Sequence, residues 1–171
     1  MKNKQFEYVI LPAIYHKQST KYTCGPASLF IALKSILNKI NISEKQLAKI
    51  CRTTPEEGTS PKKMVGALKK LKIKYQVFEH GTIPLLENKL LNLNLCLVNY
   101  QAWNCSAKNL ADLDAGHYAV MFGFNKKNFY ISDPLEGFIT KRKDLFEKRW
   151  QDKENDNTKT HHWMIAVPIK Q

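Results

Sequence analysis

Apolar residues in the first half of the chain recur at the spacing of amphipathic helices. Between residues 25 and 38 they form one broad face, made of Leu29, Ile31, Ala32, Leu33, Ile36 and Leu37. Two further helices are predicted by the residues that begin them. Ser43 followed by Gln46 is a capping-box signature, and Ser60 with Pro61 supplies an N-cap and a first-turn proline.

The second half of the chain is rich in β-branched and aromatic runs, which favour strands. Strands are predicted over residues 73–78, 95–101, 116–124, 128–133 and 162–168, and helices over 84–92 and 142–150. The short polar turn at 125–128 joins two of these strands, so a hairpin is expected there. Polar loops are expected over residues 52–59, 102–116 and 151–160, after a lead-in strand and loop over 6–16.

The order of these segments predicts the fold class. Helices come first and antiparallel strands follow, which is the order of an α+β domain with a helical half packed on an antiparallel sheet. A chain of 171 residues suffices for one compact domain, so residues 1–171 are expected to form a single unit.

Composition indicates where the protein is expected to be located, but it does not identify the reaction that the protein performs. No apolar run approaches the roughly 18 residues that a membrane span needs, and the first residues lack a signal-peptide core. A cytoplasmic location is expected, with signal-independent secretion left open. The four cysteines, at 24, 51, 96 and 105, form no CxxC pair. We therefore expect reduced thiols and no metal or cofactor.

A net charge of +12 raises the question of an acidic partner. Only three of the basic residues are arginine, the residue that reads phosphates and base edges most often, so composition argues against a nucleic-acid partner. The densest basic stretch covers residues 62–74 and is interpreted as a solvated face. Composition leaves the oligomeric state open.

Cys24 is the residue with the strongest chemical signal. It lies in the segment Tyr-Thr-Cys-Gly-Pro-Ala-Ser, immediately before the first predicted helix. The thiolate is the nucleophilic form of cysteine, and the unpaired N–H groups of a helix N-terminus favour negative charge. A cysteine at this position is also compatible with simple packing in the core.

Three further residues supply the groups that a nucleophilic cysteine requires. His117 begins one predicted strand and Asp133 ends the next, so neighbouring strands could bring imidazole and carboxylate together. Gln18 carries an amide that could donate to an oxyanion. Each residue alone has a structural explanation, since a strand histidine, an Asp-Pro turn and a loop glutamine are all common. Their combination in one chain favours catalysis.

These residues also form a pattern that resembles a known family. Gln18-x5-Cys24-Gly25, then Gly116-His117-Tyr118, then Asp133-Pro134 is similar to the bacteriocin-processing cysteine peptidases, family thirty-nine of that class, which cut after a double-glycine leader. Gly58-Thr59-Ser60-Pro61 and the segment from Leu97 to Asn104 are similar to the regions between these motifs. Pro26 and Ser28 are more similar to its stand-alone branch than to its transporter branch.

The resemblance implies a papain-like fold and a peptide or protein substrate. It implies Cys24 as nucleophile, His117 as general base and acid, Asp133 as the residue that orients the imidazole, and Gln18 in the oxyanion hole. The chain carries no spans and no nucleotide-binding motif, so leader removal coupled to export is not implied. A thiol acyltransferase or deamidase, a catalytically silent peptide-binding module and a basic nucleic-acid-binding domain stay as alternatives.

Overall fold

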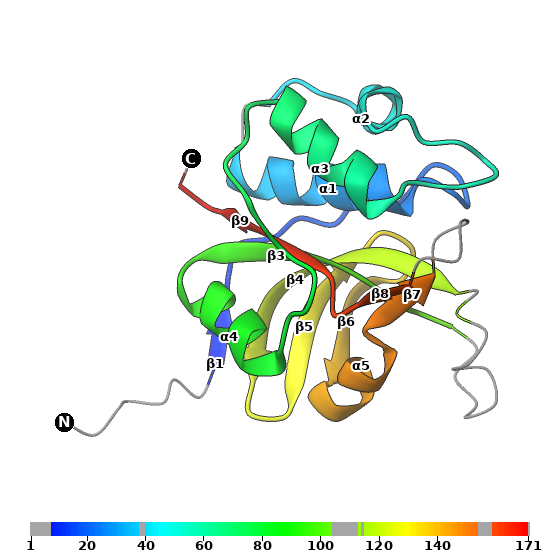
Figure 1. The fold of residues 1–171 in the computed structure, drawn as a ribbon. Helices are drawn as coiled ribbons and strands as arrows, with labels where there is room; N and C mark the ends of the chain where they lie inside the picture. The colour runs from blue at the N-terminus through cyan, green and yellow to red at the C-terminus, as the bar shows by residue number, and fades with distance from the viewer. Residues whose placement is uncertain (1–7, 38–39, 104–112, 114, 154–158, 171) are drawn as a thin grey trace.

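The structure, a computed structural model, describes residues 8–37, 40–103, 113, 115–153 and 159–170. Three helices lie together above a twisted antiparallel sheet, and two more helices lie on the opposite side of the sheet (Figure 1). This arrangement confirms the predicted α+β class. The predicted loop over 102–116 lies largely outside the described residues, and Cys105 and Asn104 lie in that part of it.

The helical half consists of α1 (Cys24–Ile36), α2 (Glu44–Ile50) and α3 (Pro61–Lys70). The predicted capping box of α2 is present, with Ser43 and Gln46 each accepting from the other's backbone N–H. Ser60 caps α3 through the Lys63 N–H, and proline occupies the first turn. These caps explain why the sequence located the helix starts to within a residue.

The sheet is formed by strands that come mostly from the second half of the chain. Its members are β1 (Tyr8–Ile10), β2 (Gln76–Phe78), β3 (Asn94–Gln101), β4 (Gly116–Asn125), β5 (Asn128–Asp133), β6 (Gly137–Arg142) and β9 (Met164–Pro168). Their order is β2-β9-β3-β4-β5-β6, and β1 pairs with the far end of β4. All pairings are antiparallel, and the predicted hairpin is the pair β4–β5.

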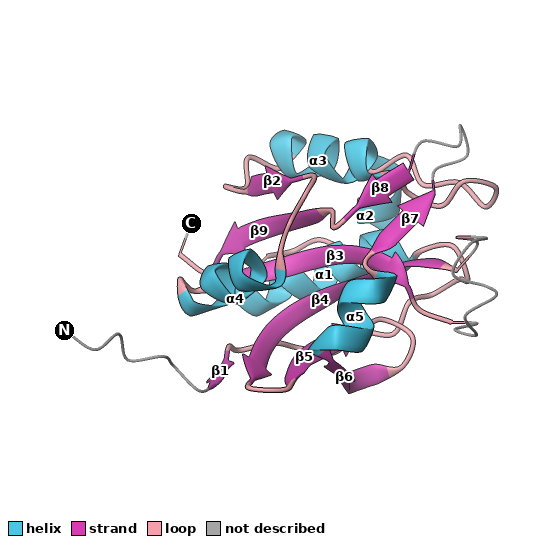
Figure 2. Ribbon diagram, turned by 60° about the horizontal axis from the view of Figure 1, so that its bottom comes forward, coloured by secondary structure: helices cyan, strands magenta, loops and turns pink. Residues whose placement is uncertain are grey.

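Both faces of the central strands are covered. The helix α1 packs on one face, and α4 (Ile83–Leu91) and α5 (Lys143–Arg149) lie on the other face (Figure 2). Every residue of β3 is buried, which explains why its sequence does not alternate between apolar and polar residues. Within the described residues, no helix has the length and apolar character that crossing a membrane requires.

Three details differ from the expectations of the sequence. The strand predicted over 73–78 is shorter, because it pairs with β9 only from Gln76. Strand β6 was not predicted, since its alternating half-buried and exposed residues include few apolar side chains. The predicted loop 151–160 contains a small hairpin of β7 (Gln151–Lys153) and β8 (Lys159–His161).

His162 also differs from its expected place in the last strand. It has a positive φ of 54° and lies in the turn before β9. Its ring stacks on Trp150 at a centroid distance of 4.9 Å, and its Nδ1 donates to the Gly81 carbonyl at 2.9 Å. These contacts give His162 a packing role. His161 ends β8.

Cys51 and Cys96 belong to the core, as expected for filler positions. Both side chains are buried, at the end of α2 and in β3. Burial raises the pKa of the Cys51 thiol to about 12 and shifts the pKa of Cys96 in the same direction. Neither thiol is therefore a nucleophile at neutral pH.

Candidate active site

Cys24 is the first residue of α1 and is half-buried. The N-cap residue Thr23 makes no side-chain capping bond, and the first turn contains no acidic residue. The free N–H groups and the helix dipole therefore favour negative charge at this end of α1. The sequence predicted both the helix start and this placement of the thiol.

Gly25 lets a neighbouring loop approach the start of α1. A Cβ atom built on Gly25 would lie 2.9 Å from the Cβ of Thr59, closer than real side chains pack. Thr59 is itself tied to Thr53 by a hydroxyl–hydroxyl hydrogen bond of 2.7 Å. The glycine after the cysteine thus has a structural reason, because it allows the loop before α3 to pack directly beside the thiol.

His117 and Asp133 meet on the sheet beside Cys24. His117 Nε2 donates to Asp133 Oδ1 at 3.0 Å, and each side chain is 1% exposed. The imidazole also interacts electrostatically with the Cys24 side chain. Since Nε2 is bonded to the carboxylate, Nδ1 is the ring nitrogen left for this interaction. The structure therefore brings together three residues that the sequence predicted from separate segments.

The register of the strands explains this meeting. Val120 in β4 lies opposite Ser132 in β5, which makes His117 and Asp133 diagonal neighbours on one face of the pair. The carboxylate also accepts from the backbone N–H groups of Leu135 and Glu136, at 2.8 and 3.1 Å. The Asp-Pro turn after β5 thus fixes the orientation of Asp133.

The electrostatics of this buried group favour an imidazolium. Burial alone would lower the pKa of His117, but the hydrogen bond to Asp133 and the interaction with Cys24 outweigh it and raise the pKa to about 9. Burial acts to raise the pKa of Asp133, yet the His117 partner and the two backbone donors hold it below its usual value. Histidine protonated and aspartate ionised is the charge state that stabilises a neighbouring thiolate.

Gln18 lies in the loop that leads into α1. Its backbone N–H donates to the Pro134 carbonyl at 2.8 Å, which ties this loop to the turn that follows Asp133. Its side-chain Nε2 donates to the Thr20 carbonyl at 2.8 Å, and its buried Oε1 has no partner among the described residues. An amide nitrogen carries two N–H bonds, so one donor is left for a ligand.

The structure adds Tyr100, which the sequence did not single out, and places Trp103, which the sequence suggested as a residue that could line the cleft, beside His117. Tyr100 donates its hydroxyl to Asp133 Oδ2 at 3.0 Å. The ring of Trp103 lies 4.7 Å from the ring of His117, and the residue is 37% exposed. Tyr100 could have been noticed, because a hydroxyl inside a buried strand needs a buried partner.

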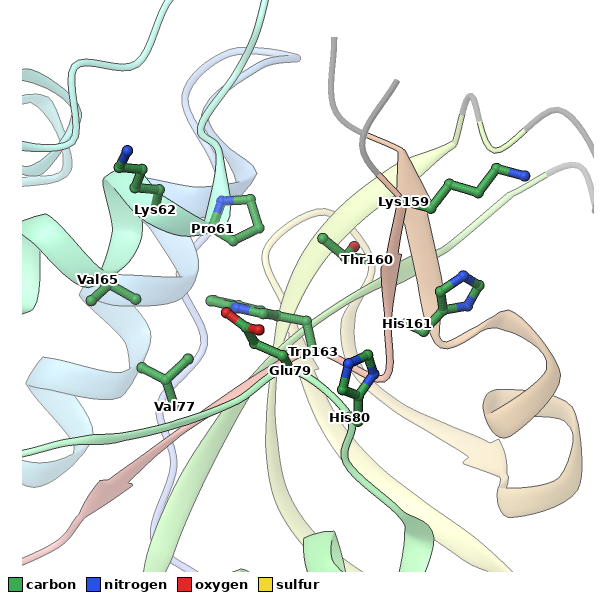
Figure 3. A pocket seen from close by; sticks show the side chains of 10 residues that line it. All are labelled: Pro61, Lys62, Val65, Val77, Glu79, His80, Lys159, Thr160, His161 and Trp163. Carbon is green, nitrogen blue, oxygen red and sulfur yellow. The ribbon is translucent and has the colours of Figure 1, made fainter. Parts of the chain in front are cut away.

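A pocket of about 600 Å³ lies between the helical half and the sheet half (Figure 3). Side chains of α3 form one wall and those of β8 the opposite wall, with Trp163 between them. The residues that line it are Pro61, Lys62, Val65, Val77, Glu79, His80, Lys159, Thr160, His161 and Trp163.

Each wall of the pocket is connected to an element that carries part of the candidate site. Pro61 follows the loop that packs on Gly25, and Thr160 pairs with Asp152, whose carboxylate covers Gly116. Within the described ranges, no group of three or more His, Cys, Asp or Glu could hold a metal ion.

Comparisons with known proteins agree with this geometry. The structure is similar to the peptidase domain of Streptococcus ComA, a bi-functional ABC transporter involved in quorum sensing, with a TM-score of 0.68 and 20% identity over 92% of this chain and 98% of that one. It is also similar to a C39-like peptidase from Bacillus anthracis, with a TM-score of 0.70 and 15% identity over 94% and 97% of the two chains.

A third solved structure is a double-glycine-motif protease of an AMS/PCAT transporter in complex with its leader peptide, with a TM-score of 0.63 and 16% identity over 93% of this chain and 94% of that one. These likenesses establish the papain-like peptidase fold. Among curated sequences, an uncharacterised protein of Methanothermobacter marburgensis is 26% identical over 77% of this chain and 79% of its own length.

The sequence itself carries the family assignment. Residues 12–154 match the sequence model of the peptidase C39 family, and this range includes all four predicted site residues. The match covers most of the chain, and the shared fold extends over nearly all of it. The chain therefore belongs to the peptidase C39 family.

Proposed function

We propose that this protein is a thiol-dependent peptidase that cleaves a peptide bond through Cys24, His117 and Asp133. One observation carries the proposal: the buried His117 imidazole is hydrogen-bonded to the Asp133 carboxylate and interacts with the Cys24 side chain at the start of α1. A structural histidine would need neither a half-exposed thiol beside it nor an ionised, fully bonded carboxylate.

The arrangement can perform acyl transfer in two steps. The Cys24 thiolate attacks the peptide carbonyl carbon, and the oxyanion that forms is met by the Gln18 amide and the Cys24 backbone N–H. Collapse of this intermediate breaks the C–N bond, and the His117 imidazolium gives its proton to the leaving amine. A water molecule deprotonated by His117 then hydrolyses the thioester and regenerates the thiolate–imidazolium pair.

The substrate is proposed to lie between the helical half and the sheet. Trp103 beside His117 offers an aromatic wall, and the pocket between α3 and β8 has room for a side chain of the peptide. The structural neighbour with a bound leader peptide supports a peptide as the ligand class. The particular sequence that is cut is left to experiment.

Cleavage of a mixed peptide library, read by mass spectrometry, tests the proposal. Cys24→Ala and His117→Ala are each expected to abolish cleavage, whereas Cys51→Ala, which removes a buried thiol elsewhere, should retain it. Iodoacetamide should alkylate Cys24 rapidly at pH 6–7, where an ordinary exposed thiol reacts slowly, and His117→Ala should lower this rate to that of an ordinary thiol.

The same assays separate the alternatives. Full cleavage by Cys24→Ala would refute the proposed nucleophile. Preferential alkylation without any hydrolysis, but with transfer of an acyl group to an added amine, would indicate a transferase on the same site. Saturable peptide binding with an unreactive Cys24 would indicate a silent binding module.

A further inference from the structure

Tyr100 is a wholly buried tyrosine whose hydroxyl reaches the candidate site from a third strand. Its residue is 0% exposed and lies directly opposite His117 in the pairing of β3 with β4. Its hydroxyl extends past β4 to Asp133 at the end of β5, where it donates to Oδ2 at 3.0 Å. Tyr100 therefore contacts the carboxylate on the oxygen that His117 does not use.

The four donors around Asp133 divide between its two oxygens. Oδ1 accepts from His117 Nε2 and from the N–H groups of Leu135 and Glu136, whereas Oδ2 accepts from Tyr100. A carboxylate held at both oxygens cannot turn about its Cβ–Cγ bond without breaking a hydrogen bond. The Tyr100 bond therefore fixes the plane of the carboxylate and, through Nε2, the plane of the imidazole.

Packing of the ring does not require the hydroxyl. The aromatic ring of Tyr100 packs at 5.7 Å from Phe146 in α5 and edge-on at 6.1 Å from His117. A phenylalanine would make both contacts. The hydroxyl is explained only by its buried partner, since a polar group in the core is retained where it is hydrogen-bonded.

The surroundings keep this hydroxyl a donor. Burial and the neighbouring Asp133 and Glu136 charges raise the pKa of Tyr100, against a small opposing effect of Arg149. The Lys141 ammonium lies 5.4 Å from the ring centroid and faces the π-cloud. Tyr100 is thus protonated at every pH at which the protein works.

We propose that Tyr100 is a positioning residue, which acts through Asp133 to hold the His117 imidazole with Nδ1 toward Cys24. This inference rests on the proposed function, because it assigns a role within the same site. It adds to the site a member on β3, so that three adjacent strands define the orientation of one imidazole. In this role Tyr100 acts through Asp133 and not on the substrate.

The test is Tyr100→Phe, with the alkylation rate of Cys24 measured by iodoacetamide from pH 5 to 10. Loss of a hydrogen bond to a buried charged group changes a rate or an equilibrium constant by about 10- to 100-fold. The alkylation rate of Cys24 at pH 6 should therefore fall by about that factor. The profile should shift to higher pH and rejoin the wild-type profile at its alkaline plateau. Tyr130→Phe is the matched control, since it removes a hydroxyl that accepts from Asn125 at the other end of the β4–β5 pair.

A double-mutant cycle distinguishes positioning from general damage. In an Asp133→Ala background, Tyr100→Phe should change the alkylation rate no further, because its only route to Cys24 has been removed. An equal loss in both backgrounds, or a uniform fall in rate at all pH values, would refute positioning. Far-UV circular dichroism and thermal melting verify that both variants are folded.

Failure of this inference differs from failure of the proposed function. If wild-type Cys24 reacts at pH 6 no faster than an ordinary exposed thiol, the proposed function is wrong and the inference falls with it. If wild-type Cys24 is activated and Tyr100→Phe matches it across the pH range, the proposed function stands and Tyr100 is a packing residue.

Discussion

At the scale of single residues, Gln18 combines a candidate catalytic role with a bond inside its own loop. Its side-chain nitrogen already donates to the Thr20 carbonyl, while its backbone N–H holds the turn after Asp133. The Thr20 bond fixes the amide in place, so the direction of its second N–H bond is set before a substrate binds. Such preorganised donors stabilise a developing oxyanion most strongly.

Replacement of Gln18 by alanine should therefore affect turnover more than binding. We expect kcat on a cleaved peptide to fall by roughly a hundredfold or more, with little change in KM, because the lost bond forms in the transition state. Gln18→Glu places an acceptor at the same position and should be at least as damaging. Steady-state kinetics on one identified peptide measures both, and an unchanged kcat would move the oxyanion donor elsewhere.

At the scale of elements, the loop before α1 is anchored by a buried carboxylate of α2. Glu44 accepts from the Ser19 hydroxyl at 2.6 Å, from the Ser19 N–H at 3.1 Å and from His16 Nε2 at 2.7 Å. Glu44 is 6% exposed, and these donors hold its pKa below the usual value despite burial.

Loss of this anchor should destabilise the protein. Glu44→Ala leaves several partly buried donors without a partner, so we expect a loss of about 2–3 kcal/mol in the free energy of unfolding. Glu57→Ala removes an exposed carboxylate that pairs with Lys63, and should change stability by less than about 1 kcal/mol. Urea denaturation of both variants makes the comparison, and equal losses would show that Glu44 is no anchor.

The sequence predicted helices better than strands, for identifiable reasons. The starts of α2 and α3 were marked by serines whose capping bonds are local. Strand β6 and the β7–β8 hairpin depend on pairing partners, and their polar residues carry little periodic signal. The same distinction applies to the site, since the cysteine and histidine motifs are local whereas the Tyr100 contact depends on the register of three strands.

At the scale of the whole molecule, the His117–Asp133 pair links stability to pH. The pKa of His117 rises from 6.5 to about 9 on folding, so the folded state binds the proton more tightly than the unfolded chain. This contribution is complete below pH 6.5 and is lost as the pH rises through about 9. The lowered pKa of Asp133 links stability to pH at the acid end. This contribution is complete above the pKa of 3.8 that the carboxyl has in the unfolded chain, and it is lost as the pH falls through the lower pKa of the folded state.

Melting temperatures measured from pH 6 to pH 10 test this linkage. The wild-type protein should lose stability across the window from 6.5 to about 9, and His117→Asn should flatten the profile there. His80→Asn, which changes an exposed histidine of the pocket rim, should leave the shape of the profile unchanged. A wild-type profile without a decline in this window would contradict the raised pKa.

The division of the candidate site between the helical half and the sheet has a consequence for the folding of the chain. Cys24 belongs to α1, whereas His117 and Asp133 belong to strands whose hydrogen bonds lie within the sheet. In the proposed mechanism, Cys24 would therefore gain its base only once the helices and the sheet have docked. A chain that has not yet folded would then carry no activated thiol, and the proposed cleavage activity would depend on completed folding.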